Sequence, residues 1–370
     1  MKTMQCGAQL TMSVVRENFW IPSLKRKVKG LINSCITCFR QRAKLSKQLM
    51  GQLPVSRVQP SFAFINVGVD YAGPITIKYG NPRSNVKTKA YFAVFICLAT
   101  KAVHVEIVSS LSSQSFMSAF NRFVSRRWIP SIVYSDNGTN FQGAQKDISN
   151  LLSSNNFQEE VIDHASSRFI EWNFIPPHSP HFGGLWEAGI KSLKHHLKRT
   201  MTGQVFTFEE LSTLTTQIET ILNSHPICRL DDSHELNYLT AGHFLIGRSF
   251  ISFPILNFID TPTNRLNRWQ RLTKVLALIW KGWYDDYLQT LQRRHKWNNI
   301  CPNLNIGDKV LIKDDLAPSL QWKLGKITWL FPGPDGRVRV VTVKTSRGEF
   351  KRTIHKLAKL PINDDLPSVS

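Results

Sequence analysis

Short apolar runs and helix-spaced apolar positions divide the chain into three regions. In the middle region, runs typical of strands cover residues 62–71, 90–98, 101–108 and 131–135, and residues 99–101 are expected to turn the second strand into the third. Helical spacing predicts helices over 112–127, 142–153, 184–200 and 207–223. Three strands, a helix and a fourth strand predict an α/β fold, a mixed sheet flanked by helices.

The two flanking regions have different patterns. Residues 1–50 are predicted to be helical and basic, and residues 50–60, with one glycine and two prolines, are predicted to be a linker. Residues 262–300 form a helical stretch with four tryptophans, at positions 269, 280, 283 and 297. Glycine-split strand runs between 305 and 360 predict a small β-barrel, with Trp322 and Trp329 in its core. The predicted tail covers residues 361–370.

The charge of the chain indicates what kind of partner it binds. The chain has 47 Lys and Arg against 26 Asp and Glu, a net charge of +21. Ten of the basic residues fall between Lys323 and Lys359, with two acids, and nine fall between Arg16 and Lys47, with one. Clustered positive charge favours a polyanion such as nucleic acid over a merely soluble basic surface. No apolar run approaches the ~20 residues of a membrane span. There is no signal-peptide pattern, and the six scattered cysteines favour a reduced, intracellular protein.

Three carboxylates stand where the pattern predicts strand ends and a helix start. Asp70 ends the first apolar run, Asp136 follows the fourth, and Glu187 begins the helix 184–200. Taken singly, each has an ordinary explanation, since Asp-Asn-Gly is a common turn and a first-turn Glu complements the helix dipole. Taken together they favour a cage for two Mg²⁺ ions, because paired divalent ions activate the attacking oxygen and stabilise the leaving oxygen in phosphoryl transfer.

The helix 184–200 carries a second signal. Its apolar stripe is followed one residue later by a stripe of Glu187, Lys191, Lys194 and Lys198. The stripe is explained either by weak i, i+4 ion pairs or by a metal ligand beside a track for phosphates. We favour the second explanation for Lys191 and Lys194, and extend it to Lys198. The loop 176–184, rich in proline and glycine, is expected to fold over the site.

With these features the sequence resembles retroviral-type integrases, which have a ribonuclease H-like catalytic core. In particular, it resembles the integrases of BEL/Pao long-terminal-repeat retrotransposons. The motifs that carry the resemblance are Val69-Asp-Tyr-Ala-Gly-Pro74, Ser135-Asp-Asn-Gly-Thr-Asn-Phe141, residues 176–187, residues 236–247, and Trp280-Lys-Gly-Trp283 with the basic C-terminal runs. The resemblance implies a zinc-binding helical domain over 1–50, a catalytic domain over 58–250, a helical and SH3-like barrel domain that binds nucleic acid over 262–361, and a tail over 362–370. Residues 151–168 are expected to be a surface insertion.

The resemblance also implies roles for individual residues. Asp70, Asp136 and Glu187 become the catalytic triad that binds two Mg²⁺ ions, with Mn²⁺ as a substitute, while Asn137 and His181 join the three lysines as DNA contacts. The implied reaction is trimming of the 3′ ends of element DNA and their transfer into target DNA, in the nucleus, by a homo-oligomer.

The ligands of a zinc ion are harder to identify in this sequence. Cys35 and Cys38 have the spacing of zinc ligands, and in similar integrases two histidines precede such a pair. The first histidine here is His104, with Gln5 and Met1 near the expected positions and Cys6 as a weak substitute. Either the sequence starts too late or the site has decayed. The incomplete zinc site leaves open an alternative, a protein that binds DNA without joining it. A further alternative is a ribonuclease H-type nuclease, which shares the fold.

Overall fold

The computed structural model describes residues 7–36, 53–152, 170–175, 184, 194–197, 199–201, 204–229, 238–251, 256–292, 302–314 and 318–360. The chain divides into two compact units, Met1–Leu53 and Pro54–Ser370, which are described separately. In the first unit, α1 (Gly7–Asn18) packs against α2 (Leu24–Ser34), and Leu24 and Val28 are buried. The predicted helical character of this region is confirmed, while α4 (Val55–Val58) is a single turn inside the predicted linker.

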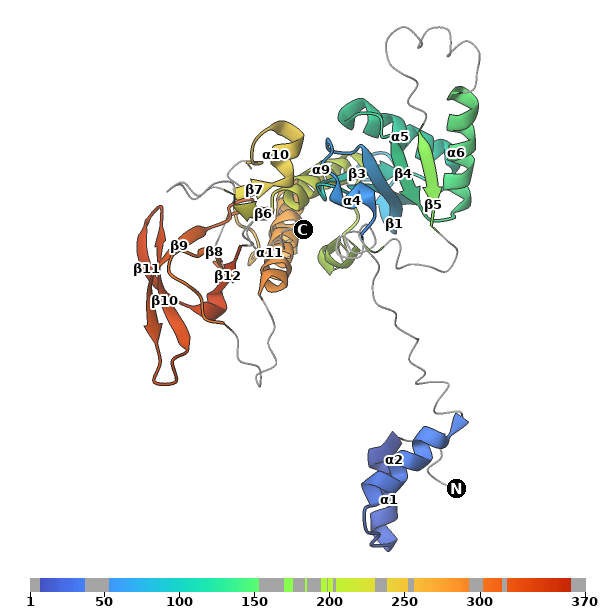
Figure 1. Ribbon diagram of the computed structural model, residues 1–370. Coiled ribbons are helices and arrows are strands. Elements are labelled where there is room, and N and C mark those ends of the chain that lie inside the picture. The colour runs from blue at the N-terminus through green and yellow to red at the C-terminus, as the bar shows by residue number, and fades with distance from the viewer. Residues whose placement is uncertain are drawn as a thin grey trace. The chain divides into compact units, whose positions relative to one another are not determined.

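The second unit is built on a five-stranded sheet (Figure 1). Its strands are β1 (Asn66–Lys78), β2 (Lys87–Cys97), β3 (Val103–Val108), β4 (Ile132–Ser135) and β5 (Glu171–Phe174), in the order β3-β2-β1-β4-β5. β1, β2 and β3 are antiparallel neighbours, and β4 and β5 are parallel to β1. The predicted fold class is confirmed, because this is a mixed sheet with the strand order of the ribonuclease H-like fold.

Two details of the sheet differ from the prediction. β1 does not end at Tyr71 but continues to Lys78 past a break in register between Ala72 and Ile75, which contains Pro74. Proline usually ends a strand because it lacks an N–H, and here the bulge absorbs it. Asp70 therefore lies inside a strand and not at its end. β5 was not predicted, since only four half-polar residues form it and pairing with β4 stabilises them.

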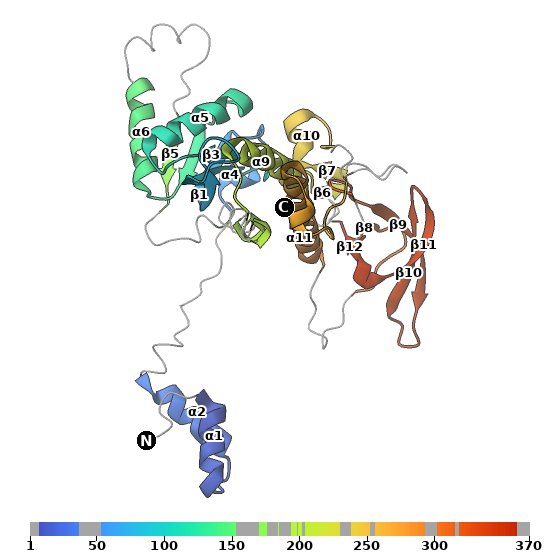
Figure 2. The ribbon, with the colours of Figure 1, turned by 180° about the vertical axis from the view of Figure 1, so that it is seen from behind.

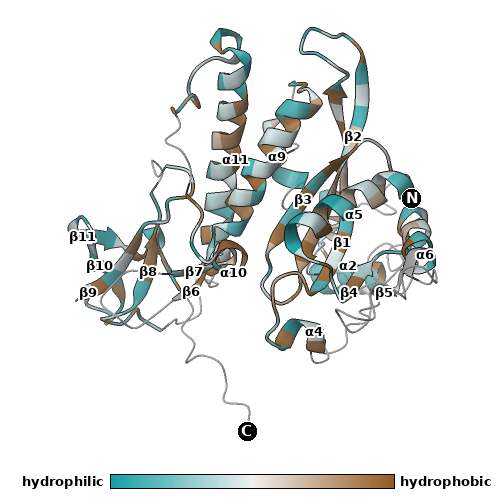
Figure 3. Cartoon of the chain, turned by 90° about the horizontal axis from the view of Figure 1, so that it is seen from above, coloured by the Kyte–Doolittle hydropathy of each residue, from teal (hydrophilic) through white to brown (hydrophobic). Residues whose placement is uncertain are grey.

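Helices cover both faces of this sheet. On one face, α5 (Ser113–Arg127) and α6 (Thr139–Leu152) bury a phenylalanine-rich cluster that includes Phe95, Phe116 and Phe123. On the other face, α9 (Phe208–Asn223) packs against apolar side chains of β1, β2 and β3. A capping box of Thr207 and Glu210 starts α9. Hydrophobic and hydrophilic residues alternate along α9 and along α11 (Arg268–Leu291), as expected of helices with one buried face (Figure 3).

The remaining elements form a C-terminal layer beside α11. β6 (Pro226–Arg229) pairs with β7 (Tyr238–Thr240), and α10 (Ala241–Ile246) follows. A second sheet has the order β11-β10-β9-β8-β12, from strands β8 (Lys309–Ile312), β9 (Leu324–Pro332), β10 (Val338–Thr345), β11 (Gly348–Thr353) and β12 (Leu357–Lys359). The 3₁₀ turns are Thr263–Arg265 and Ile354–Lys356. Among the described residues β11 and β12 do not pair, so the predicted barrel is seen as an open antiparallel sheet.

An aromatic cluster joins α11 to this second sheet. The ring of Trp322 lies 5.3 Å from that of Trp280 and 4.9 Å from that of Tyr284, and the Tyr284 hydroxyl donates to the Ile312 carbonyl at 2.9 Å. The C-terminal sheet accordingly lies beside α11 in both views (Figures 1 and 2). The predicted core position of Trp322 is confirmed, since it is 6% exposed.

The same prediction is wrong for Trp329, which is 61% exposed. Between the pairs Val343–Ile327 and Thr342–Trp329, β10 advances one residue and β9 advances two, so Thr328 is an extra residue in β9. A one-residue bulge reverses the side-chain alternation of a strand. Ile327 therefore points into the core while Trp329, two residues later, points to solvent. Trp297 lies outside the described residues.

A network of buried charges closes the edge of the first sheet at β3. Two side chains of α9 take the place of a further strand: Glu219 accepts from the Val105 N–H at 3.0 Å, and Asn223 accepts from the Val103 N–H at 2.8 Å. His104 is fully buried between Glu106, at 2.9 Å, and Glu219, at 3.1 Å. Arg122 and Arg126 bind Glu106, and Arg127 binds Glu219.

This network shifts the pKa of its members in opposite directions. Burial alone lowers the pKa of His104, but hydrogen bonds to Glu106 and Glu219 outweigh it and raise the pKa above 6.5. Burial alone raises the pKa of Glu219, but the hydrogen bond and charge of His104 and the charge of Arg127 hold it below 4.5. Both ionised groups therefore stabilise the folded state. Protonated His104 does so at pH values below its pKa, and ionised Glu219 does so at pH values above its pKa.

We predict that Glu219→Gln lowers the free energy of unfolding by about 3 kcal/mol at neutral pH, because Arg127 and His104 lose a buried partner. The loss is full above the ordinary pKa of Glu219, 4.5, and shrinks as the pH falls through the lowered folded pKa. Denaturant unfolding of wild type and variant across this range checks it. Glu209→Gln, an exposed position on the same helix, is the control. An equal loss from Glu209→Gln, or a pH-independent loss from Glu219→Gln, contradicts the account.

The stability contributed by protonated His104 follows the opposite course. It is fully present below pH 6.5 and is lost as the pH rises through the raised folded pKa. The difference in melting temperature between wild type and His104→Gln is therefore expected to shrink on raising the pH from 6 toward 9, as measured by circular dichroism at closely spaced pH values. A difference that grows over this range contradicts the assigned pKa direction.

Candidate functional site

The parallel pairing of β1 with β4 brings two of the three predicted carboxylates together. The pairing runs Asn66–Ile132, Val67–Val133 and Gly68–Tyr134. β4 ends at Ser135, and the same register, continued to the residue just after it, sets Asp70 beside Asp136. Neighbouring strands lie only about 4.8 Å apart. The two aspartates, 66 positions apart in the sequence, are thus neighbours across one strand pair.

Both aspartates belong to the sheet face that α9 covers. Val67 and Val69 are buried on the α5 and α6 face, so Asp70 alternates to the other face, as does Ala72. On β4, Val133 is on the α5 and α6 face and Tyr134 packs on the other, which places Asp136 with Asp70. Asp70 is half-buried and Asp136 is exposed, so the pair lies where the sheet opens to solvent.

The described part of the helix that follows Glu187 packs on this same face. Residues 194–197, 199 and 200 are helical, and Leu197 and Met201 are buried in the cluster that contains Ala72 and Val94. Val94 is the direct partner of Asp70 across β1 and β2. His196 of this segment also lies 3.3 Å from Asp286 of α11, so the described segment belongs to the apolar layer that this sheet face shares with α11. Glu187 itself lies outside the described residues.

A tight loop holds the Asp136 carboxylate in place. The Gly138 N–H donates to Asp136 Oδ1 at 3.0 Å, and the Asn137 side chain donates to the Ile175 carbonyl at 2.6 Å, tying the loop to the end of β5. A Cβ on Gly138 would lie 2.6 Å from Asn140 Oδ1 and 3.1 Å from Asp136 Oδ1. A Cβ at this position would push the Asn140 side chain aside and crowd the Asp136 carboxylate, so glycine fits this loop best.

Stacked rings fasten the two aspartate segments to each other. Tyr71, which follows Asp70, stacks on Phe141 of the Asp136 segment with ring centroids 5.3 Å apart, and Phe116 of α5 meets Phe141 edge-on at 5.1 Å. Burial raises the pKa of the Tyr71 hydroxyl to about 12, so Tyr71 is neutral at physiological pH. These rings are the reason that the Tyr and Phe of the two motifs accompany the aspartates.

Some of the other predicted site residues lie within the described part of the chain, and others lie outside it. Asn137 is exposed, but its amide is engaged with Ile175, so its first role is to shape the loop. Lys194 is exposed on the described helical segment. Cys35, just after α2, is half-buried. Glu187, Lys191, Lys198, His181 and Cys38 lie outside the described residues, and their predicted roles stay predictions.

The aspartate pair has the chemistry of a divalent metal site. Among the described residues, the Gly138 N–H is the one recorded donor to the Asp136 carboxylate, and it uses a single oxygen. Two carboxylates side by side at a solvent-open edge fit Mg²⁺, which binds through few carboxylates and keeps several waters. No group of three or more His, Cys, Asp or Glu within the described ranges is close enough to hold a metal, so a third ligand has to come from outside them.

The residues of the first unit do not supply the ligands of a zinc site as the two aspartates supply those of a magnesium site. A closed structural zinc site needs four ligands. The first unit supplies Cys35 and Cys38 by sequence but contains no histidine. Zinc binding by two histidines and two cysteines of this unit is therefore excluded for the sequence as it stands.

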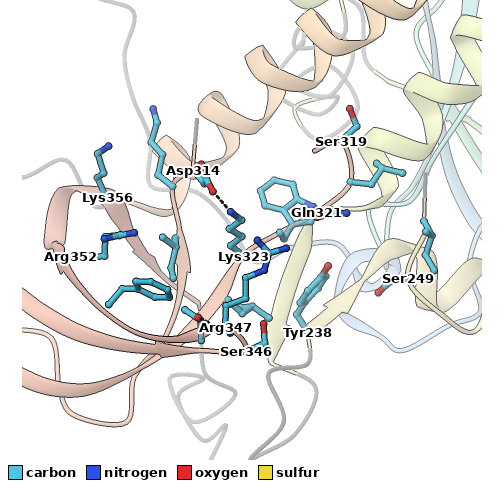
Figure 4. Close-up of a pocket in the computed structure, with 18 of the residues that line it drawn as sticks. Tyr238, Ser249, Asp314, Ser319, Gln321, Lys323, Ser346, Arg347, Arg352 and Lys356 are labelled. Atoms are coloured by element: carbon cyan, nitrogen blue, oxygen red, sulfur yellow. Dashed lines mark hydrogen bonds and ion pairs between the residues drawn. The ribbon is translucent and has the colours of Figure 1, made fainter. Parts of the chain in front are cut away.

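A basic cavity of about 910 Å³ opens between the C-terminal sheet and the segment after β7 (Figure 4). Six basic side chains and one acidic side chain line it: Lys313, Lys323, Arg347, Lys351, Arg352, Lys356 and Asp314. Lys323 is paired with Asp314, and Lys313 lies 2.8 Å from Asp285. In Figure 4, Arg352 comes from β11, Arg347 from the turn before it and Lys356 from the 3₁₀ turn after it, with Tyr238 of β7 and Ser249 on the other side. The excess of positive charge suits phosphate groups.

Known families match the two ends of the chain. Residues 3–44 match the integrase zinc binding domain, and residues 267–360 match a family of unknown function, DUF5641. Over 198 residues, 54% of the chain, the sequence is 21% identical to the Pro-Pol polyprotein of feline foamy virus. The chain spans 15% of the length of that relative. Together these matches support a retroviral-type integrase.

Solved structures with a similar trace include retroviral integrases, though at low overall similarity. A chain of the simian T-cell lymphotropic virus intasome in complex with PP2A regulatory subunit B56 gamma matches with a TM-score of 0.32 and 12% identity, over 97% of this chain and 96% of that one. The catalytic core domain of HTLV-2 integrase in complex with magnesium, in its trimeric form, matches with a TM-score of 0.30 and 17% identity, over 50% of this chain and 99% of that one.

Within the part of the chain that the structure describes, no helix is long and apolar enough to cross a membrane.

We predict that Gly138→Ala weakens divalent metal binding while leaving the fold intact, because the added methyl group displaces the Asp136 carboxylate. The measurement is the rise in melting temperature on titration with Mn²⁺, which ligand linkage makes a direct readout of affinity. Asp70→Asn and Asp136→Asn are expected to abolish the rise. Gly30→Ala, where a Cβ meets nothing within 4 Å, and Asp147→Asn, an exposed acid on α6, are the controls. An unchanged Mn²⁺ response in Asp136→Asn contradicts the site.

Proposed function

We propose that the chain is the integrase of a long-terminal-repeat retrotransposon of the BEL/Pao type, a polynucleotidyl transferase that trims the 3′ ends of element DNA and joins them to target DNA. The observation that carries this proposal is the β1–β4 register, which, continued past the end of β4, sets Asp70 beside Asp136 on the face of the sheet that α9 covers. The integrase zinc-binding match and the Pro-Pol relative support it.

Each carboxylate has a role in this mechanism. Asp70, Asp136 and Glu187 would hold the two Mg²⁺ ions, Asp70 and Asp136 one of them and Asp70 and Glu187 the other. When bound, the ions activate the attacking oxygen and stabilise the leaving oxygen. The loop of Asn137 and Gly138 and the Tyr71–Phe141 stack keep the two aspartates in register with each other. The protein forms no covalent bond to DNA, since water and then a 3′-hydroxyl attack the phosphodiester directly.

Basic surfaces hold the DNA. Lys191, Lys194 and Lys198 follow Glu187 at helical spacing and would track phosphates beside the site. The cavity between the C-terminal sheet and the segment after β7 offers six further basic side chains. Contacts of this kind bind the DNA backbone with little sequence preference. Joining two DNA ends to one target requires more than one copy of the chain, and the reaction belongs in the nucleus.

The domain organisation follows from the same proposal. A helical domain related to integrase zinc-binding domains covers residues 1–50, the catalytic domain covers 58–250, and the DNA-binding C-terminal domain covers 262–361, with 362–370 as a tail. The catalytic boundaries enclose all five strands of the first sheet, and the C-terminal boundaries enclose α11 and the second sheet.

A binding protein without catalytic activity is the second candidate. The observation in its favour is that the first unit has no histidine to complete the zinc site. The intact structure around Asp70 and Asp136 opposes it, because the glycine, the asparagine and the stacked rings that position the aspartates are all present. A ribonuclease H-type nuclease shares the fold and differs in its substrate and in joining no ends.

We predict that the purified chain joins short duplexes, carrying the terminal repeats that flank its coding sequence, to plasmid DNA in the presence of Mg²⁺ or Mn²⁺. Asp70→Asn, Asp136→Asn and Glu187→Gln are each expected to lower joining by about 10²-fold or more, since a metal site contributes several kcal/mol to the transition state. Product bands on sequencing gels give the rate, and Asp147→Asn on α6 is the matched control for loss of a nearby charge.

Three outcomes separate the candidates. Joined products that disappear in the carboxamide variants support the integrase. Binding of the duplex with neither cleavage nor joining, unchanged by Asp136→Asn, supports the binding protein. Cleavage of RNA–DNA hybrids without joining supports the nuclease.

A further inference from the structure

The C-terminal sheet exposes an aromatic and basic face of which the proposed reaction uses only Lys351, a residue that also lines the basic cavity. β9 contributes Lys326, Trp329 and Phe331 to this face, β10 contributes Lys344, and β11 contributes Lys351. Trp329 is 61% exposed and Phe331 is 37% exposed. We call these five residues the aromatic–lysine face. They lie on the opposite side of the sheet from the core formed by Ile327, Val341 and Val343.

The exposure of Trp329 is built into the strand. If β9 were regular, Trp329 would point with Ile327 into the core, and the extra residue Thr328 turns it outward. The next residue on the same side, Phe331, follows at normal spacing, so the two residues lie about 6.6 Å apart along the strand. The bulge turns Leu330 toward the core in place of Trp329 and leaves the larger ring in solvent, which points to a use for that ring outside the core.

The charges on the face are positive and close to the rings. Lys351 Nζ lies 3.9 Å from the centre of the Phe331 ring, which holds the ammonium over the aromatic surface. Lys326 and Lys344 are direct cross-strand partners, and Glu349, the one acid in this row, lies opposite Lys344. Two like charges placed directly opposite each other destabilise a sheet unless an anion lies between them.

Rings and lysines interleaved at strand spacing match the chemistry of an unpaired nucleic acid strand. Bases present a flat surface to an aromatic ring only when they are unpaired, and the phosphates between them meet the lysines. A duplex hides its base faces, and an acidic protein segment would use the lysines but has no planar groups for both rings. The charge and the rings together therefore select a single strand.

We propose that the aromatic–lysine face binds single-stranded nucleic acid, with successive bases stacked on Trp329 and Phe331 and phosphates on Lys326, Lys344 and Lys351. This site is separate from the aspartate pair and needs neither a metal ion nor catalysis. β11 also lines the basic cavity with Arg352 and Lys356 follows it, so a strand that leaves the face has further positive charge beside it.

The test measures binding of fluorescein-labelled single strands to the full chain by fluorescence anisotropy. The probes are oligothymidylate, oligouridylate, an abasic oligomer of the same length and a duplex of the same length. Trp329→Ala and Phe331→Ala are each expected to weaken binding of the base-containing single strands by about tenfold or more, as loss of one stacked base does. Trp329→Phe keeps a ring and is expected to restore most of the affinity.

Matched controls separate stacking from charge and from folding. Trp269→Ala removes a tryptophan of α11 that is 62% exposed and is expected to leave every affinity unchanged. The abasic oligomer is expected to bind more weakly than oligothymidylate and to ignore Trp329→Ala. Lys351→Ala is expected to weaken both and to reduce the salt dependence of binding. Comparison of oligothymidylate with oligouridylate tells whether DNA or RNA is preferred.

The proposal is overturned if Trp329→Ala binds oligothymidylate and oligouridylate as wild type does, if the abasic oligomer binds as tightly as the base-containing strands, or if the duplex loses as much affinity as the single strands. Binding is measured without added divalent metal ions, so it does not depend on the aspartate pair. Failure of the proposed strand-transfer activity therefore leaves this test unaffected.

Discussion

The pairing of β1 with β4 is the constraint on which the candidate site depends. It is parallel, three residue pairs long, and sets the register that makes Asp70 and Asp136 neighbours. A shift by one residue would turn one of the two carboxylates to the opposite face of the sheet. Everything that fixes this register, from the Phe116 cluster beneath the strands to the stack of Tyr71 on Phe141, therefore also fixes the geometry of the site.

The edge of the first sheet at β3 is closed by side chains, and this supports the β1–β4 pairing from the other end of the sheet. Among the described residues no further strand lies beside β3, and Glu219 and Asn223 of α9 bond its backbone instead. Because α9 is also the helix that covers the face of the aspartates, the buried charges around His104 anchor that cover. Arg268 of α11 binds Glu210 at the start of α9, which connects the first sheet to the helix that carries the C-terminal sheet.

The sequence predicts the parts of this molecule that follow simple periodicity. The strands of the first sheet, α5, α9 and the aspartates at neighbouring strands follow from apolar runs and spacing. It fails where tertiary pairing overrides the pattern: β1 continues through Pro74, β5 exists only as a partner of β4, and the bulge at Thr328 reverses Trp329. The buried network around His104 was not predicted at all, because its members come from β3, α5 and α9 and share no local motif.

The central claim is that Asp70 and Asp136 share a divalent ion. The most direct measurement is a crystal structure of the chain soaked in Mn²⁺, with the metal located by its anomalous scattering. The account predicts a peak within about 2.0–2.3 Å of a carboxylate oxygen of both aspartates, and a second peak that adds an oxygen of Glu187. Well-ordered carboxylates with no peak between them, or manganese bound elsewhere, would contradict it.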